Sequence, residues 1–202
     1  IAAPNNDGGG LMLFRTGMQS SGGGNHWGED AWSIFNNTIV DNNDAPYGGG
    51  GIMIRDARAD FNDLIVRNNS STQWGGGAIS LHINSKAKIN KGLIVNNSVS
   101  YGQGNILLEG TGSDKELILI NTTIANNTSN NGVTGGGIIN WDGYPILLLN
   151  SILKQNSSTS TSYGNSQFIS PGMDIYYSNT TTTSGIYGNI NTSPIFMNAD
   201  YE

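Results

Sequence analysis

A block of glycines followed by alternating apolar residues recurs along this chain and constrains the fold more than any other feature. Copies of this element run at residues 8–13, 48–54, 75–81, 102–108 and 135–140. A second repeated element is an apolar residue, any two residues and an Asn, as in the pair Ile39 and Asn42. A third alternating stretch lies between them, for example at 59–62 and 117–121. Each repeat therefore contains three short strands.

The length of the repeat indicates a solenoid. Successive copies are separated by roughly 26 to 32 residues, a period typical of stacked repeat architectures. No stretch keeps an apolar period of about 3.6 residues over three turns, which excludes helical and leucine-rich repeats. We therefore predict an all-β fold, a right-handed parallel β-helix with three short strands per rung and about six to seven rungs. A rung is one turn of the coil, about 4.8 Å from the next.

Stacked rungs place equivalent residues over one another, so the repeats predict columns of side chains. Two aliphatic columns are expected to face the core: Ile52, Ile79, Ile106 and Ile138 form one, and Ile39, Ile65, Ile94 and Ile124 the other. The recurrent Asn is expected at a sharp corner, because Asn tolerates a left-handed backbone and its amide can bond the next rung. That predicted ladder consists of Asn42, Asn68, Asn97 and Asn127.

Composition narrows the class of partner. The chain contains nine Lys plus Arg and fifteen Asp plus Glu, which gives a net charge of −6. Nucleic acids need clustered cations, so we expect no nucleic-acid partner. No apolar run approaches the ~20 residues of a membrane span, so none is expected. Cys is absent, which fits an exported bacterial surface protein better than a small disulfide-stapled domain, and we expect an extracellular or cell-surface location.

The repeats resemble those of the right-handed parallel β-helices of the pectin-lyase-like superfamily. Residues 76–79 with the apolar-x-x-Asn element are similar to the repeats of bacterial polymorphic outer-membrane and autotransporter passenger proteins. The last third resembles the choice-of-anchor Q class of surface proteins at residues 150–153, 156, 174–175, 188–190 and 194–196. The resemblance implies the fold. It does not select a function, because the superfamily contains lyases, hydrolases, adhesins and passive stalks.

We expect a single β-helix domain over residues 1–202. Residues 14–35 are predicted to form an irregular insertion and residues 157–202 loop-rich last rungs, because both stretches leave the repeat pattern. No amphipathic capping helix is visible at either end, and a solenoid needs its terminal rungs covered. The chain is therefore expected to be part of a longer protein or to associate end to end.

Alternation predicts an outward column at the end of the strand that follows each Gly block. Its members are Phe14, Arg55, His82, Glu109 and Trp141, with Asp142 in the adjoining turn. The resemblance implies that this face would carry the site of a polysaccharide lyase or hydrolase. Arg55 would then neutralise a uronate carboxylate, and His82 or Glu109 would abstract the proton. Glu109 and Asp142 would be the carboxylate pair of a hydrolase. The alternative is an ordinary row of surface ion pairs.

No cofactor is expected, and a Ca²⁺ ion is possible but unsupported by the residues. A Ca²⁺ site needs several converging carboxylates. Asp56, Asp60 and Asp63 are close in sequence but are expected in a turn and the next strand, which makes common ligation doubtful.

Aromatic residues precede three of the Gly blocks, at Tyr47, Trp74 and Tyr101. Stacked rungs would place these rings in a ladder. An exposed ladder offers flat faces to sugar rings or to a protein partner, so these three and Trp141 are the candidate ligand-binding residues. The structural alternative is that the rings protect the corner and fix the register.

Two hypotheses of function follow. The first is a non-catalytic extracellular β-helix, an adhesin, stalk or fibre segment that presents loops to a polysaccharide or a cell-surface protein. It rests on full-length repetition, low charge and the lack of a conventional catalytic set. The alternative is a polysaccharide lyase or glycoside hydrolase that acts on an acidic polysaccharide.

Overall fold

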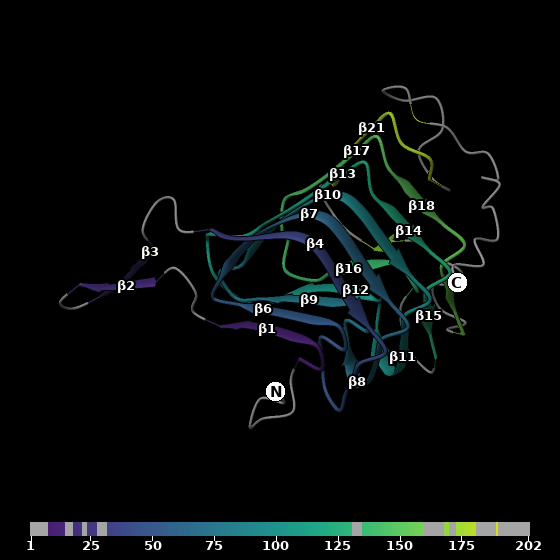
Figure 1. Ribbon diagram of the computed structural model, residues 1–202, viewed down its shortest axis with the longest axis horizontal. Coiled ribbons are helices and arrows are strands. Elements are labelled where there is room, and N and C mark those ends of the chain that lie inside the picture. The colour runs from purple at the N-terminus through teal and green to yellow at the C-terminus, as the bar shows by residue number, and fades with distance from the viewer. Residues whose placement is uncertain are drawn as a thin grey trace.

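The chain coils into a parallel β-solenoid with three parallel sheets (Figure 1). The computed structural model describes residues 8–14, 18–21, 24–27, 32–130, 135–159, 168–169, 173–180 and 189. Within these residues there is no helix, and thus none long and apolar enough to cross a membrane. The all-β class and the three strands per rung are as predicted. The coil makes about five turns, fewer than the six to seven rungs expected.

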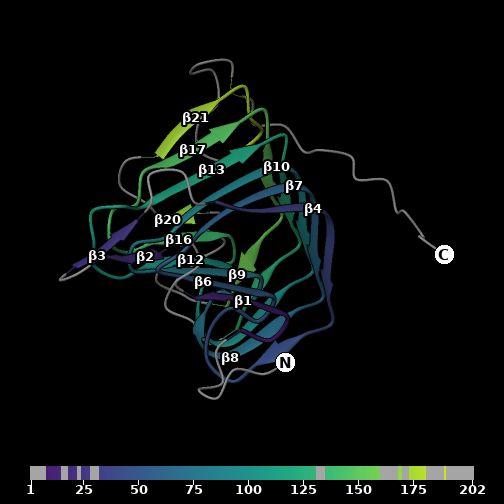
Figure 2. The ribbon, with the colours of Figure 1, turned by 60° about the vertical axis from the view of Figure 1, so that its left-hand side comes forward.

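Each sheet is built from equivalent segments of successive rungs, and in the second sheet some rungs contribute two strands, β13 with β14 and β17 with β18. The first sheet consists of β1 (Leu11–Phe14), β6 (Ile52–Arg55), β9 (Ile79–His82), β12 (Ile106–Glu109), β16 (Ile138–Asn140) and β20 (Phe168–Ile169). The second consists of β4 (Ser33–Asp41), β7 (Arg58–Arg67), β10 (Lys86–Val95), β13 (Glu116–Ile120), β14 (Thr123–Ala125), β17 (Ile146–Leu149), β18 (Ile152–Lys154) and β21 (Met173–Tyr176). The third consists of β5 (Asp44–Ala45), β8 (Ser70–Gly75), β11 (Ser98–Gln103), β15 (Thr128–Ser129) and β19 (Ser157–Ser158). Figure 2 shows β4, β7, β10, β13, β17 and β21 stacked in that order.

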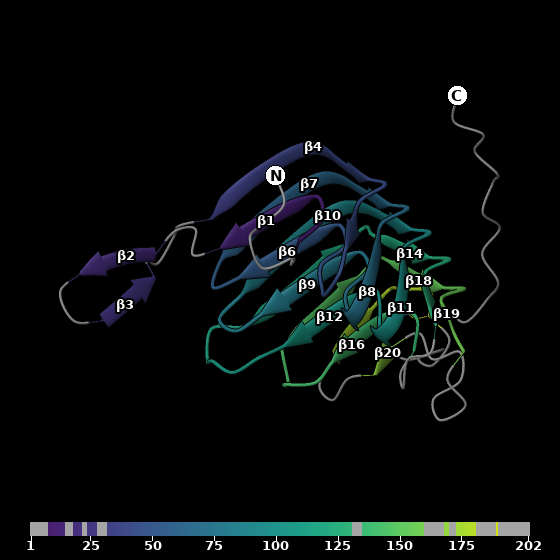
Figure 3. The ribbon, with the colours of Figure 1, turned by 90° about the horizontal axis from the view of Figure 1, so that it is seen from below.

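An antiparallel hairpin interrupts the first rung between β1 and β4. Its strands are β2 (Met18–Ser21) and β3 (Gly24–Trp27). The hairpin projects away from the stacked rungs (Figures 1 and 3). It lengthens the chain between β1 and β4 without adding a turn to the coil.

The first predicted core column is confirmed. Ile52 pairs in register with Ile79, Ile79 with Ile106, and Ile106 with Ile138. All four side chains are buried. The proposition that equivalent residues lie over one another therefore holds for this sheet.

The second predicted core column is wrong in its first two rungs. Ile39 and Ile65 pair with each other but face outwards, and Ile39 is 62% exposed. The inward column consists of Val40, Val66, Ile94, Ile124 and Leu153. The first copies of the repeat contain two adjacent aliphatic residues, so sequence alone does not say which one faces the core. The pairing puts the second of the two inside.

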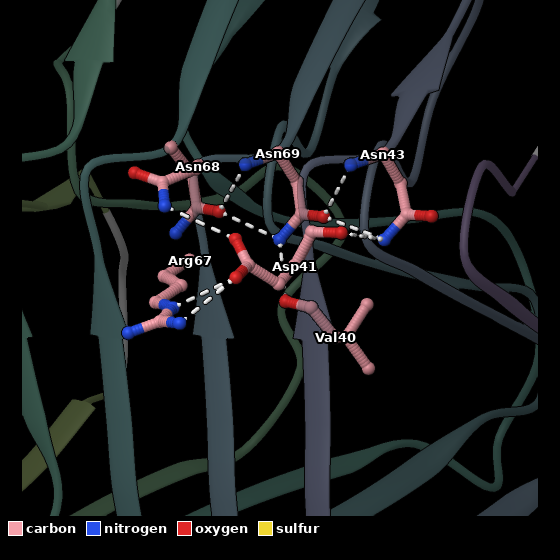
Figure 4. A network of polar contacts seen from close by, with 7 residues as sticks. Val40, Asp41, Asn43, Arg67, Asn68 and Asn69 are labelled. Atoms are coloured by element: carbon pink, nitrogen blue, oxygen red, sulfur yellow. Dashed lines mark hydrogen bonds and ion pairs between the residues drawn. The ribbon is translucent and has the colours of Figure 1, made fainter. Parts of the chain in front are cut away.

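The asparagine ladder exists, but its members differ from the prediction. It consists of Asn43, Asn69, Asn97, Asn127 and Asn156. From Asn69 onwards, each Oδ1 accepts from the backbone N–H and from Nδ2 of the Asn on the preceding rung, at 2.8 to 3.1 Å. Asn42 and Asn68 are predicted members of the ladder, but they lie one residue before the ladder Asn. Their backbone is left-handed, with φ of 56° and 55°. Figure 4 shows two ladder members, Asn43 and Asn69.

A second internal ladder lies where the second sheet bends. The backbone N–H of Gly92 donates to Thr122 Oγ1 at 3.3 Å, and that of Thr122 donates to Ser151 Oγ at 3.0 Å. The backbone N–H of Ser151 donates to Ser178 Oγ at 3.0 Å, and the backbone N–H of Ser178 donates to Asn189 Oδ1 at 2.9 Å. These hydroxyls satisfy backbone groups that the bend removes from the strand ladder.

The Gly blocks cover the outer face of the first sheet. The side chains of Met53, Ser80, Leu107 and Ile139 alternate with the core column, yet all four are buried. A Cβ atom on Gly49 would lie 2.9 Å from Met53 Cβ, and one on Gly104 would lie 2.4 Å from Ile139 Cγ1. The glycines are therefore required by close approach of the backbone to this second apolar layer.

Candidate functional site

The predicted strand-end column is assembled as expected along the first sheet. Phe14 pairs with Arg55, Arg55 with His82, and His82 with Glu109. Trp141 follows β16 directly, and its backbone N–H donates to the carbonyl of Leu108 at 3.0 Å. The column thus brings a cation, an imidazole and a carboxylate to consecutive rungs.

His82 is held neutral in this column. Burial, and secondarily the charge of Arg55, lower the pKa of His82 to about 4. Its Nε2 atom lies 3.3 Å from Glu109 Oε1 but makes no hydrogen bond among the described residues. At neutral pH this contact therefore joins an uncharged imidazole to a carboxyl group and is not an ion pair. A neutral His82 is a poor stabiliser of negative charge.

Glu109 lies in the electrostatic field of Asp142. Burial raises the pKa of Glu109, and the nearby charge of Asp142 raises it further. Asp142 is itself engaged, because its Oδ2 accepts from the backbone N–H of Gly110 at 2.6 Å. A carboxyl group whose pKa is raised by burial and by a neighbouring carboxyl group is the kind of group that general acids use.

The turn after this column contains features that the sequence did not reveal. Tyr144 is fully buried, and its hydroxyl donates towards the carbonyls of Ile83 at 2.6 Å and Glu109 at 3.1 Å. Ile83 has a φ of 61°, a conformation costly for a β-branched residue. Through these two hydrogen bonds Tyr144 fixes the backbone at Ile83, next to His82, and at Glu109.

An ion-paired strap closes the same end of the rung. Arg58 Nη2 and Lys86 Nζ lie 2.6 and 2.5 Å from the two carboxylate oxygens of Asp114. Burial alone would raise the pKa of Asp114, but hydrogen bonds and charge from Lys86 and Arg58 lower it overall. Arg58 is 8% exposed, so the strap anchors the loop of residues 110–115 to the second sheet.

The predicted aromatic ladder holds for two of its three members. Tyr47 and Trp74 pack edge to face with ring centroids 5.5 Å apart. Tyr101 pairs with Gln73, and the residue beside Trp74 is Gly102. Trp74 is the fifth residue after the ladder Asn69, whereas Tyr101 is the fourth after Asn97. Because Ser70 pairs with Ser98, the two rings lie one position out of register.

Gln103 links this corner to the strand-end column. The indole N–H of Trp141 donates to Gln103 Oε1, so this ring reaches back towards the strand of Tyr101. Trp74, Tyr101 and Trp141 are 59%, 61% and 42% exposed. Together with Tyr47 we call them the aromatic surface. The sequence placed Trp141 in a separate constellation because no pattern indicates the bond to Gln103.

An axial groove on the second sheet was missed entirely. Its volume is about 470 Å³, and its floor contains Ile39, Ile65, Leu93 and Thr123 on consecutive rungs. The rim contains Asp63 and Lys91, whose charged atoms lie 3.6 Å apart. The sequence pattern predicts that Ile39 and Ile65 face the core. In the structure both face outwards and line this groove.

The three carboxylates considered for Ca²⁺ do not converge. Asp60 lies 3.7 Å from Lys88, and Asp63 faces Lys91. Asp56 is in the turn after β6, with a φ of 48°. Within the described ranges, no group of three or more His, Cys, Asp or Glu is placed to hold a metal ion.

Comparison with known proteins does not add a relative. No family model, no curated protein and no solved structure matches the chain.

Proposed function

We propose that this chain is a non-catalytic extracellular or cell-surface β-solenoid whose aromatic surface binds polysaccharide. A right-handed coil and kinship with the pectin-lyase-like superfamily belong to the same proposal, on the strength of the repeats. An adhesin, stalk or fibre segment needs a rigid body and fixed contact groups, and the two internal ladders stiffen two corners of the rung.

The observation that carries the proposal is the exposure of three aromatic rings on neighbouring rungs, with Trp74 on β8, Tyr101 on β11 and Trp141 bonded to Gln103 of β11. Trp74 is 59% exposed although it packs against Tyr47. Sugar rings stack on such flat apolar faces, while nearby amides bind hydroxyl groups. Gln103 supplies an amide beside Trp141. The rigid strands fix the spacing of the rings, which lowers the entropic cost of binding.

Affinity electrophoresis in gels that contain a neutral glucan, a xylan or polygalacturonate tests this function. We expect retardation in at least one gel, and a dissociation constant at least about tenfold higher for Trp74→Ala. Ile34→Ala is the matched control, because Ile34 is 67% exposed on the second sheet. Equal retardation of both variants and the native protein would contradict the proposal.

A second candidate is hydrolysis of an acidic polysaccharide at the strand-end column. The raised pKa of Glu109 beside Asp142 favours it, because a general acid must retain its proton near neutral pH. The resemblance-based role of Arg55, neutralising a uronate carboxylate, belongs to this candidate.

Release of reducing ends from polygalacturonate distinguishes the candidates. Turnover that is lost in Glu109→Gln but retained in Trp74→Ala would establish the hydrolase and remove the non-catalytic function. Absence of turnover at any pH between 4 and 8, with binding intact, would remove the hydrolase.

A further inference from the structure

The first strand of the second sheet has an open edge. β4 is nine residues long and pairs with β7 on one side. On its other side it pairs with no strand in the described part of the chain. In a parallel sheet alternate residues direct both their N–H and C=O groups to the same neighbour, so alternate residues of β4 present both groups to the open side. The hairpin of β2 and β3 projects away from this edge (Figure 3).

Side chains on β4 also lack the neighbour that later rungs have. Ile39 is 62% exposed, whereas Ile65, its partner on the next rung, is half-buried between two strands. On the inner face Phe35 stacks on Phe61 with centroids 4.9 Å apart, and its other face is only partly covered. The edge therefore offers apolar surface as well as backbone groups.

The asparagine ladder has an unfilled position at the same end. Every other described ladder Asn accepts two hydrogen bonds at Oδ1 from the Asn of the preceding rung. Asn43 donates to Asn69 and to the carbonyl of Asp41, but its Oδ1 accepts nothing among the described residues. In Figure 4 this oxygen points away from the ladder. Asn43 Oδ1 is therefore placed to accept hydrogen bonds in the same way as the Oδ1 atoms in the four Asn–Asn contacts of the ladder.

We propose that this end is a docking site for a parallel β-strand of a partner polypeptide that carries the rung pattern. The strand would pair with β4, place apolar side chains over Phe35 and Val40, and place an Asn over Asn43. The five stacked asparagines set this requirement, since the amide of the incoming Asn must donate to Asn43 Oδ1. The proposal concerns strand addition and is independent of polysaccharide binding.

The test uses the unaltered protein and a fluorescent peptide with the sequence of residues 58–71. This peptide carries the rung pattern that already pairs with β4 from the other side. We expect saturable binding by anisotropy, and slower amide hydrogen exchange in residues 33–41 with no change in β17 or β21. A peptide with Asn69→Ala should bind about tenfold more weakly, because the hydrogen bond from the side-chain Nδ2 to Asn43 Oδ1 is lost while the backbone N–H remains.

Backbone methylation provides the matched control. Two peptides are N-methylated on alternate residues, one on the even and one on the odd positions. Only one of them should lose binding, because alternate amides of a parallel strand face the protein. Equal binding of all peptides, loss of binding by both methylated peptides, or protection away from β4 would each overturn the proposal. Dimers of the protein alone with β4 protected would also overturn it, since a second copy would then fill the edge.

Discussion

At the scale of single residues, two adjacent asparagines at one corner have different tasks. The first takes the left-handed conformation, with φ of 57° at Asn96 and 56° at Asn126. The second points inwards and bonds the next rung, as Asn97 does with Asn127. The order matters because only the residue after the left-handed one directs its side chain along the axis of the coil.

Replacing a ladder asparagine should be far more damaging than replacing its neighbour. Asn97 Nδ2 donates to the carbonyls of Val66 and Val95 and to Asn127, and Oδ1 accepts from Asn69. Asn97→Ala leaves these buried groups unpaired, so we expect a loss of about 3 kcal/mol in the free energy of unfolding. Asn96→Gly, which keeps a left-handed backbone without strain, should change it by less than about 0.5 kcal/mol. Urea denaturation measures both, and equal losses would contradict the ladder's role.

His82 should make the protein less stable as the pH falls. Its pKa is lowered from 6.5 to about 4 on folding, so between these values the unfolded chain binds more protons. Stability that is present above pH 6.5 is therefore lost as the pH falls towards 4, by up to about 3 kcal/mol. Glu109, whose pKa is raised, acts in the opposite sense just above its ordinary value.

The comparison that isolates this effect is the native protein against His82→Gln. Unfolding free energies measured from pH 7 to pH 4.5 should fall less steeply in the variant. Parallel curves would show that His82 titrates normally in the folded state.

At the scale of elements, the Gly blocks form a cover for the first sheet. Their backbone passes so close to the neighbouring rungs that a methyl group has no room. Gly50→Ala would place Cβ 2.1 Å from the Ser70 carbonyl and 2.5 Å from that of Gly77. We expect a loss of more than about 3 kcal/mol, or failure to fold.

Gly143→Ala is the control for this prediction. Gly143 has a φ of 65°, and a Cβ atom there would meet nothing within 4 Å. The expected cost is therefore only the backbone strain, about 1 kcal/mol. Thermal denaturation of the two variants should separate crowding from strain, and similar melting temperatures would refute the close approach.

The sequence predicts which residues of a strand face the core only where the alternation of apolar and polar residues allows a single choice. The column from Ile52 to Ile138 was placed correctly from its position after the Gly blocks, although Ile106 and Ile138 also stand beside a second aliphatic residue. Ile39 stands beside Val40, and either could face the core by pattern alone. In the structure a left-handed residue at the bend, Asn37 with a φ of 49° and Asp63 with a φ of 57° on the next rung, lies two residues before each outward Ile. The same shift concealed the axial groove.

The sequence predicts which residues meet at the strand-end column, but it does not predict their pKa values. Register alone brought Arg55, His82 and Glu109 together, and repeats give register directly. The lowered pKa of His82 depends on burial by neighbouring turns. The support from Tyr144 depends on a contact 61 residues away in sequence, with Ile83, which no local pattern contains.

At the scale of the whole molecule, stability is a sum of contacts between successive rungs. A rung in the middle is covered on both sides, whereas β4 is paired on one side only among the described strands. We therefore expect amide hydrogen exchange to be slowest in β10 and β11 and faster by at least about tenfold in β4 and β5. Uniform exchange along the coil would instead indicate one all-or-none unit.

The ladder also has a consequence for how this asparagine-rich chain ages. Deamidation requires the backbone nitrogen of the following residue to attack the side-chain carbonyl carbon. After Asn69, Asn97 and Asn127 that nitrogen belongs to Ser70, Ser98 and Thr128, and it already donates to the rung before at 2.8 to 2.9 Å. The side-chain amide is held as well, so neither reacting group can turn towards the other. The same bonds that stack the coil therefore protect its corner asparagines from slow chemical conversion to aspartate.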